Sequence, residues 1–206
     1  RLGPADATAE FRVAAPPGRT TVADLEFTVW TEQGRPLDAG TAEFRHLPPP
    51  PEGDMALAEK GATASADSSY SGYSPDVTID GVWETSALHW TKRAWASQDH
   101  AGEEGHWLEI RFPEARTLSE LWIYWAVDNQ QVYSSVHYEV QFWTGTAWQT
   151  VLAVRDNPRS TVSQHTWPPT STDRVRLWQP KGGGPAVRPN IFWISEVCLF
   201  NRGTLN

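Results

Sequence analysis

The chain is poor in the features that mark several classes of protein. It has one cysteine, Cys198, so no disulfide can form within it, and the place of Cys198 in an apolar strand-like segment predicts a packed thiol rather than a reactive one. No apolar run reaches the roughly 18 residues that a bilayer span requires. The 17 Lys and Arg form no cluster and are outnumbered by 25 Asp and Glu. The net charge of −8 therefore argues against nucleic-acid and anionic-membrane partners.

Motifs of catalytic chemistry are equally scarce. The six histidines include no pair two or four residues apart, so a catalytic metal is not expected. There is no Gly-x-Ser-x-Gly elbow, phosphate loop or dinucleotide fingerprint. His100 and His106 lie near Glu103 and Glu104, a group that we interpret as a solvated charged turn. Paired carboxylates for glycoside cleavage meet only in three dimensions, but a small sandwich without a deep cleft disfavours them. We expect no catalytic residues in this chain.

Aromatic residues, by contrast, are abundant, with twelve Trp, seven Phe and five Tyr in 206 residues. So many large rings do not all fit inside, because Trp is seldom wholly buried and its N–H needs a partner. Some rings are therefore expected on a surface that touches a ligand.

A proline-rich segment, Leu47 to Gly53, divides the chain, since consecutive prolines favour a stiff extended spacer. We predict a linker at 48–53 and a main domain at 54–206. Upstream, residues 9–13 and 25–29 alternate like half-buried strands. Residues 1–47 resemble part of an immunoglobulin-like accessory β-domain, whose missing strands would lie upstream or in a separate piece of the same precursor.

The main domain is predicted to be all-β. Leu108, Ile110 and Phe112 fall on one face of their segment, which is typical of strands packed on one side. Seven or eight short strands with turns between them indicate a β-sandwich. The expected strands are 107–112, 121–126, 137–143, 148–154, 162–167, 174–179 and 192–200.

Several segments of this domain occur in the order found in one family. They are 55–58 with 62–67, then 73–81, 95–97, 105–112 with 118–124, 138–148, 174–177 and 194–197. Together they resemble the coagulation factor 5/8 type C (discoidin-like) domain, in particular the family 32 carbohydrate-binding modules of bacterial glycoside hydrolases. The resemblance implies a jelly-roll β-sandwich that binds a sugar without cutting it.

The resemblance also implies a structural Ca²⁺ ion. Two anionic oxygens among six suit this hard cation, and no Cys/His grouping suits zinc. The alternative is that Asp80 caps a turn over Gly81 while Glu196 pairs with an arginine. The implied ligands are the side chains of Asp80, Thr85 and Glu196 and the carbonyls of Val77, Val82 and Ser195.

Three loops are candidates for the sugar site, because a pyranose stacks its C–H face on a ring and offers hydroxyls to polar groups. Trp90 and Trp95 could instead plug the core, Trp95 more readily, and the second loop could be a solvated turn. Ala96 stands where galactose-binding relatives carry His, so galactose specificity is not expected. The candidates are His89, Trp90 and Arg93; Asp128, Asn129 and Gln130; and Arg188, Asn190 and Phe192.

The resulting hypothesis is a secreted carbohydrate-binding module that targets an attached upstream glycoside-acting enzyme to glycans. The start of the chain lacks a signal-peptide core, so any secretion signal is expected to have been removed or to lie upstream. Two alternatives stay open: a protein- or lipid-binding discoidin adhesion domain, and an accessory part of a glycoside hydrolase assembly.

Overall fold

A computed structural model describes residues 22–45, 47–99, 105–129 and 131–202, and nearly all regular structure in these ranges is β-strand. The helical segments are short 3-10 turns: η1 (Ala58–Lys60), η2 (Pro75–Ile79) and η3 (Trp90–Lys92). Within the described ranges, none has the length and apolar character needed to cross a bilayer. The prediction of an all-β chain is confirmed.

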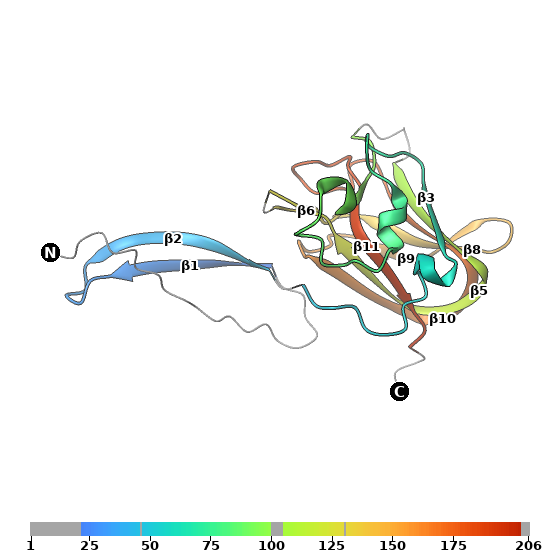
Figure 1. Ribbon diagram of the computed structural model, residues 1–206, viewed down its shortest axis with the longest axis horizontal. Helices are drawn as coiled ribbons and strands as arrows, with labels where there is room; N and C mark the ends of the chain where they lie inside the picture. The colour runs from blue at the N-terminus through green and yellow to red at the C-terminus, as the bar shows by residue number, and fades with distance from the viewer. Residues whose placement is uncertain (1–21, 46, 100–104, 130, 203–206) are drawn as a thin grey trace.

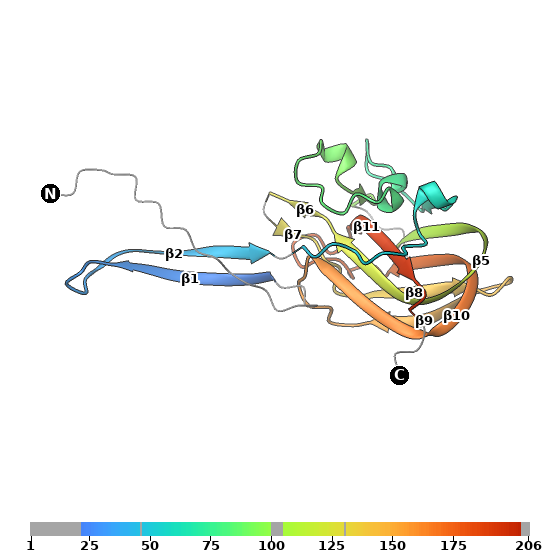
Figure 2. The ribbon, with the colours of Figure 1, turned by 60° about the horizontal axis from the view of Figure 1, so that its bottom comes forward.

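Strands β1 (Val22–Trp30) and β2 (Pro36–Arg45) form an antiparallel two-stranded ribbon. The ribbon extends away from the rest of the molecule (Figures 1 and 2). The strand expected at 25–29 lies within β1, whereas the one expected at 9–13 falls outside the described residues. The immunoglobulin-like assignment of residues 1–47 stays a prediction.

The main body is an antiparallel sandwich. Its strand order is β4-β11-β5-β10-β8-β9, with β3 added to β5. A separate small ribbon pairs β6 (Val127–Asp128) with β7 (Gln131–Val132). The bounds of the sandwich strands are β3 (Thr63–Ala66), β4 (Trp95–Ala96), β5 (His106–Trp125), β8 (Tyr138–Trp143), β9 (Trp148–Val154), β10 (Val162–Gln179) and β11 (Trp193–Phe200).

The long strands β5 and β10 bend through both layers. The second half of β5 pairs with β11 and with the start of β10, and its first half pairs with β3 and with the end of β10. The β10–β5 register breaks between Thr166 and Thr170, where Pro168 and Pro169 supply no N–H to the ladder. The short strands expected at 107–112 and 121–126 are thus parts of one strand, β5. Those expected at 162–167 and 174–179 are parts of one strand, β10.

The core lies between the layers. Leu108, Ile110 and Phe112 are buried while the residues between them face outward, as the alternation predicted. Every residue of β11 is buried, because its outer face is covered by the segment that contains Leu47 and by Trp83. Cys198 lies on this covered strand with 1% exposure, which confirms the prediction of a packed thiol.

A buried histidine makes the fold sensitive to acid. Nε2 of His165, on β10, lies 2.5 Å from the Tyr138 hydroxyl, and burial lowers the pKa of His165 to about 4. The unfolded chain therefore binds more protons than the folded one between pH 6.5 and pH 4, and stability falls as the pH drops through this window. Allowing for partial exposure of the ring, we expect a loss of about 2 kcal/mol.

This loss is measured by denaturant unfolding at pH 7 and pH 4.5 in the wild type and in His165→Gln, which keeps a group able to bond Tyr138. The wild type should lose more stability over this interval than the variant. An equal loss in both would assign the acid sensitivity to other groups.

Candidate functional site

A pocket of about 250 Å³ lies where η3, β6 and the loop before β11 meet. We call it the aromatic pocket. It combines four aromatic rings with one carboxylate and one guanidinium. Its lining residues are Tyr70, Tyr73, Trp90, Ala96, Asp128, Arg188, Ile191 and Trp193.

The rings are brought together by a tight turn. Tyr73 N–H donates to the carbonyl of Tyr70, and Gly72 between them has φ +88°. A Cβ on Gly72 would lie 3.0 Å from the indole of Trp90. Glycine therefore serves both needs here, the left-handed backbone and the close approach of the Trp90 ring.

Tyr73 lies at the centre of the ring cluster. Its ring centroid is 5.2 Å from that of Trp90 and 6.1 Å from that of Trp193, both in edge-to-face geometry. Such pairs are favourable and hold rings in fixed positions. Trp90 is 47% exposed and Tyr70 50% exposed, so two rings of this cluster present wide surfaces to solvent.

Polar groups of both signs complete the pocket. Within the described residues neither Asp128 nor Arg188 takes part in an ion pair, so each remains available to a ligand. Burial and the nearby Asp128 carboxylate raise the pKa of Tyr73, which keeps the phenol protonated and able to donate. The buried indole N–H of Trp193 donates to no acceptor in the part of the chain that the structure describes.

The candidate ligand residues separate into groups. Trp90, Asp128 and Arg188 line the aromatic pocket. Arg93 and Asn129 line a neighbouring cavity of about 290 Å³ together with Thr85 and Ser195. The two cavities lie on either side of β6. Asp128 lines the aromatic pocket, and Val127 lines the neighbouring cavity.

The remaining candidates have other roles or positions. His89 contacts Thr91 through Nδ1 at 2.9 Å and lies beside Trp90, with ring centroids 5.5 Å apart. Asn190 accepts a hydrogen bond from Gly182 N–H within its own loop. Gln130 lies outside the described residues.

Phe192 requires a correction. It is 0% exposed and packs edge-on against Trp95, at 5.7 Å between centroids, so it is a core residue and does not face a ligand. Trp95 is also 0% exposed, which confirms its expected place in the core. Because side chains alternate along a strand, burial of Phe192 directs the next residue, Trp193, to the aromatic pocket.

The sequence analysis missed Tyr70, Tyr73 and Trp193 as pocket residues. Two tyrosines flanking Ser-Gly in a turn, where a short loop cannot bury both rings, are a signal that could have identified the first two. The alternation between Phe192 and Trp193 is the signal for the third.

A second feature is an acidic contact between the η2 loop and β11. Glu196 is 0% exposed, and its Oε1 accepts a hydrogen bond from Gly81 N–H at 3.1 Å. Burial, reinforced by repulsion from the Asp80 carboxylate, raises the pKa of Glu196 to about 9. Burial raises the pKa of Asp80 as well. Two carboxyl groups are thus held together with no cationic side chain bonded to either in the described part of the chain.

This geometry bears on the two interpretations of Asp80 and Glu196. Asp80 Oδ1 accepts from Val82 N–H at 2.8 Å, so the turn-capping role exists. Glu196 forms no pair with an arginine among the described residues, and its Oε2 is buried without a partner. A pair of carboxylates of which one, Glu196, is buried and keeps an oxygen that accepts no hydrogen bond from the described residues fits a bound cation.

The other implied ligands are near this contact in sequence or line the neighbouring cavity. Val77 is buried in η2, and Val82 is 38% exposed beyond the Asp80 turn. Thr85 and Ser195 both line the neighbouring cavity, which places the expected hydroxyl and carbonyl donors on the same side of the loop.

The fold is a β-sandwich, and its loops line the aromatic pocket. The F5/8 type C domain model matches residues 61–191, and the chain belongs to this family. No curated protein matches the chain.

Solved structures support the fold. Chitosan-binding module 1 of a Paenibacillus sp. IK-5 chitosanase/glucanase is 18% identical, with a TM-score of 0.53 over 73% of this chain and 100% of that module. CpGH89CBM32-5 of Clostridium perfringens, in complex with GalNAc-β-1,3-galactose, is 13% identical, with a TM-score of 0.54 over 70% and 99%. At such identities the likeness establishes the jelly-roll sandwich, as predicted, and not the ligand.

Proposed function

We propose that residues 54–206 form a non-catalytic carbohydrate-binding module that holds a sugar in the aromatic pocket. The observation that carries the proposal is the combination of two exposed rings, Trp90 and Tyr70, with Asp128 and Arg188 in one pocket of about 250 Å³. Among the described residues Asp128 and Arg188 form no ion pair, and Asp128 accepts only a 3.3 Å hydrogen bond from the Asn129 amide. Apolar walls with a few convergent polar groups are typical of small-molecule sites.

The chemistry of a pyranose matches this lining. Its C–H face packs on the Trp90 indole, while its hydroxyls donate to the Asp128 carboxylate and accept from the Arg188 guanidinium. The Tyr73 hydroxyl, kept protonated, supplies a further donor. A neutral sugar makes use of all these groups without requiring a charge of its own.

The biological task that follows is targeting. A shallow site of this kind binds at about 1 mM to 1 μM, or roughly −4 to −8 kcal/mol. Even weak binding raises the local concentration of a linked catalytic domain. We propose that the module acts outside the cell, that the segment before it is an accessory β-domain joined by the linker at 48–53, and that a glycoside-acting domain lies upstream in the same precursor.

We also propose that Asp80, Thr85 and Glu196, with the carbonyls of Val77, Val82 and Ser195, hold a structural Ca²⁺. Bound there, the ion would neutralise the buried Glu196 carboxylate and the exposed Asp80 carboxylate, and it would tie the loop after η2 to β11. The unpartnered Oε2 of Glu196 supports this assignment. The loop that begins at this contact leads directly to η3 and Trp90, so the ion would also restrain one wall of the aromatic pocket.

The test of sugar binding is Trp90→Ala. A glycan array first identifies the ligand, and calorimetry then compares the wild type with the variant. Loss of the stacking ring should weaken binding at least tenfold, about 1.4 kcal/mol. Because Trp90 is 47% exposed, the fold should keep its stability.

Trp30→Ala is the matched control, since Trp30 is 59% exposed and lies on the β1–β2 ribbon. It should bind the sugar as the wild type does. Unchanged affinity in Trp90→Ala would place the site elsewhere. Binding to lipid vesicles in the absence of any glycan ligand would favour a discoidin adhesion domain instead.

A further inference from the structure

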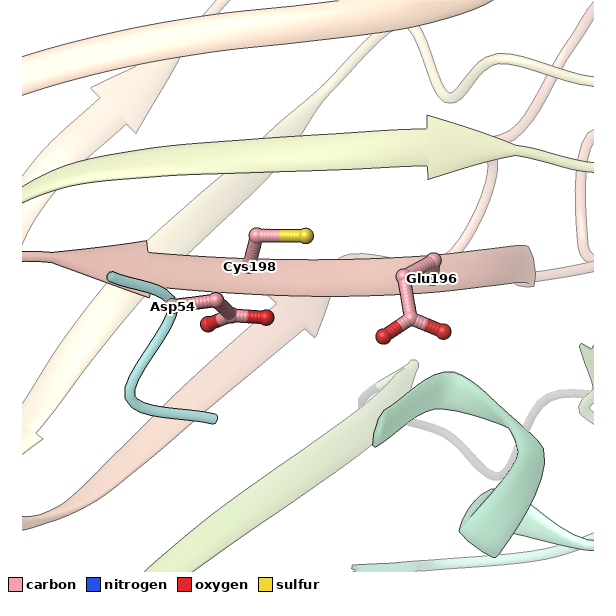
Figure 3. Close-up of side chains that lie close together, drawn as sticks. All are labelled: Asp54, Glu196 and Cys198. Carbon is pink, nitrogen blue, oxygen red and sulfur yellow. The ribbon is translucent and has the colours of Figure 1, made fainter. Parts of the chain in front are cut away.

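A cluster of a thiol and two carboxylates lies on the covered face of β11. Glu196 and Cys198 stand two residues apart on this strand, and Asp54 reaches them from the segment that follows the linker (Figure 3). One ligand atom from each of the three lies within 4.8 Å of the others. Asp54 is 7% exposed, Cys198 1% and Glu196 0%, so the cluster is shielded from bulk water.

Two further observations point to a ligand at this cluster. Oε2 of Glu196 is buried and accepts no hydrogen bond from a donor within the described ranges, although the other oxygen accepts from Gly81 N–H. A cavity of about 190 Å³, lined in part by Asp54, Glu196 and Cys198, connects the cluster with the surface beside Pro50 and Pro51. A small ion therefore has both an unused ligand atom and a route of entry.

We propose that Asp54, Glu196 and Cys198 form a binding site for a thiophilic divalent cation of the Zn²⁺ class. The site is distinct from the calcium ligand set, with which it shares only Glu196. On binding, the Cys198 S–H bond breaks and a sulfur–metal bond forms, and the thiol proton passes to solvent together with any proton held by the two carboxyl groups. The two carboxylates and the thiolate then carry three negative charges against the two positive charges of the ion, and the thiolate selects a soft or borderline metal over Ca²⁺ or Mg²⁺.

The hydrogen bonds that these residues form in the structure are compatible with metal binding. Oδ1 of Asp54 accepts from the N–H groups of Ala56 and Leu199, both at 2.9 Å, which fixes the carboxylate and leaves its second oxygen to the cluster. The Cys198 sulfur lies within 4.8 Å of the ligand oxygen of Asp54, and a metal bound here would come between them. The Lys60 amine bonds the Asp54 carbonyl at 2.6 Å, and this exposed side chain is the nearest competing positive charge.

The probe is Cd²⁺, because a thiolate–Cd²⁺ bond gives a charge-transfer absorption in the ultraviolet. Titration of the calcium-free full chain with Cd²⁺ should produce this band at one equivalent, and Zn²⁺ should displace it. Loss of a partner that only orients a metal ligand costs a metal site about 10- to 100-fold in affinity. Loss of a ligand atom should cost more, so Cys198→Ser should weaken Cd²⁺ binding at least 100-fold, as measured by calorimetry. Absence of the band from folded wild-type protein would overturn the proposal.

Two carboxylate variants separate this site from the calcium site. Asp54→Asn keeps an acceptor for Ala56 and Leu199 but removes the charge, and it should weaken Cd²⁺ binding by at least tenfold. Asp80→Asn should weaken Ca²⁺ binding and keep the Cd²⁺ band, with a Cd²⁺ affinity no lower than that of the wild type, because loss of the Asp80 charge favours the Glu196 carboxylate. Equal Cd²⁺ affinity in Asp54→Asn and the wild type, or loss of the band in Asp80→Asn, would show that this cluster is not a site of its own. Sugar binding takes no part in these measurements, so their outcome is independent of the proposed function.

Discussion

Withdrawal of calcium by a chelator is expected to lower the free energy of unfolding by about 4 kcal/mol, for protein first held at 1,000 times its Kd for Ca²⁺. The physical reason is the pairing of Asp80 and Glu196. Without an ion the buried Glu196 carboxyl group lies beside the exposed Asp80 carboxylate, and burial together with repulsion from Asp80 raises the pKa of Glu196 to about 9, so it takes up a proton at neutral pH. An ion that binds only the folded chain removes this repulsion and ties η2 to β11.

Thermal unfolding with Ca²⁺, with Mg²⁺ and with chelator measures this effect. Mg²⁺ is the matched control, because it demands stricter geometry and keeps its waters, so it should stabilise far less. Glu196→Gln should unfold at the same temperature with or without Ca²⁺. A wild type whose unfolding does not respond to Ca²⁺ would leave Asp80 as a turn cap alone.

The periodicity of the sequence was enough to predict the sandwich. Leu108, Ile110 and Phe112 alternate with outward residues, and this pattern depends only on the local two-residue repeat of a strand. The same local pattern could not show that β5 and β10 each run through both layers. Their bends depend on pairing with strands distant in the sequence, and the proline break in β10 reads locally as a strand end.

The residues of the proposed sites were likewise predictable only in part. Trp90, Asp128 and Arg188 were predicted from loop composition, and the structure brings these three to one pocket. Phe192 was assigned to the ligand and Trp193 was missed, because a one-residue error in the phase of a strand exchanges its two faces. The meeting of Asp54 with Cys198 could not be predicted from the sequence. It results from the linker segment packing on β11, where Leu199 N–H reaches Asp54.

The loop between the two proposed sites links stability to binding. It begins at Gly81, whose N–H bonds Glu196, and continues to Trp90 in the aromatic pocket. Along its course Arg93 Nε donates to the carbonyl of Leu88 at 2.7 Å, which closes the turn around η3. Restraint at the acidic end therefore limits the positions that the Trp90 ring can take, and a rigid ring loses less freedom when it stacks on a sugar.

Replacement of Trp125 by alanine is expected to lower the free energy of unfolding by about 3–5 kcal/mol. Trp125 is 1% exposed at the end of β5, with its ring centroid 5.4 Å from Tyr138 and 6.3 Å from Phe192. Its indole N–H donates to the Ser163 hydroxyl at 2.8 Å. The substitution leaves a large cavity between the layers and removes the donor to a buried hydroxyl, and both effects destabilise the fold.

Denaturant unfolding of three variants resolves these contributions. Ser163→Ala removes the hydrogen bond alone and should cost about 1 kcal/mol, with some addition for the indole N–H left unpaired. Trp107→Ala is the matched control, because Trp107 lies on the outward face of the same strand and its loss opens no cavity between the layers. If Trp125→Ala cost no more than Trp107→Ala, the two faces of β5 would be energetically equal, and β5 could not separate the core from the solvent as the sandwich requires.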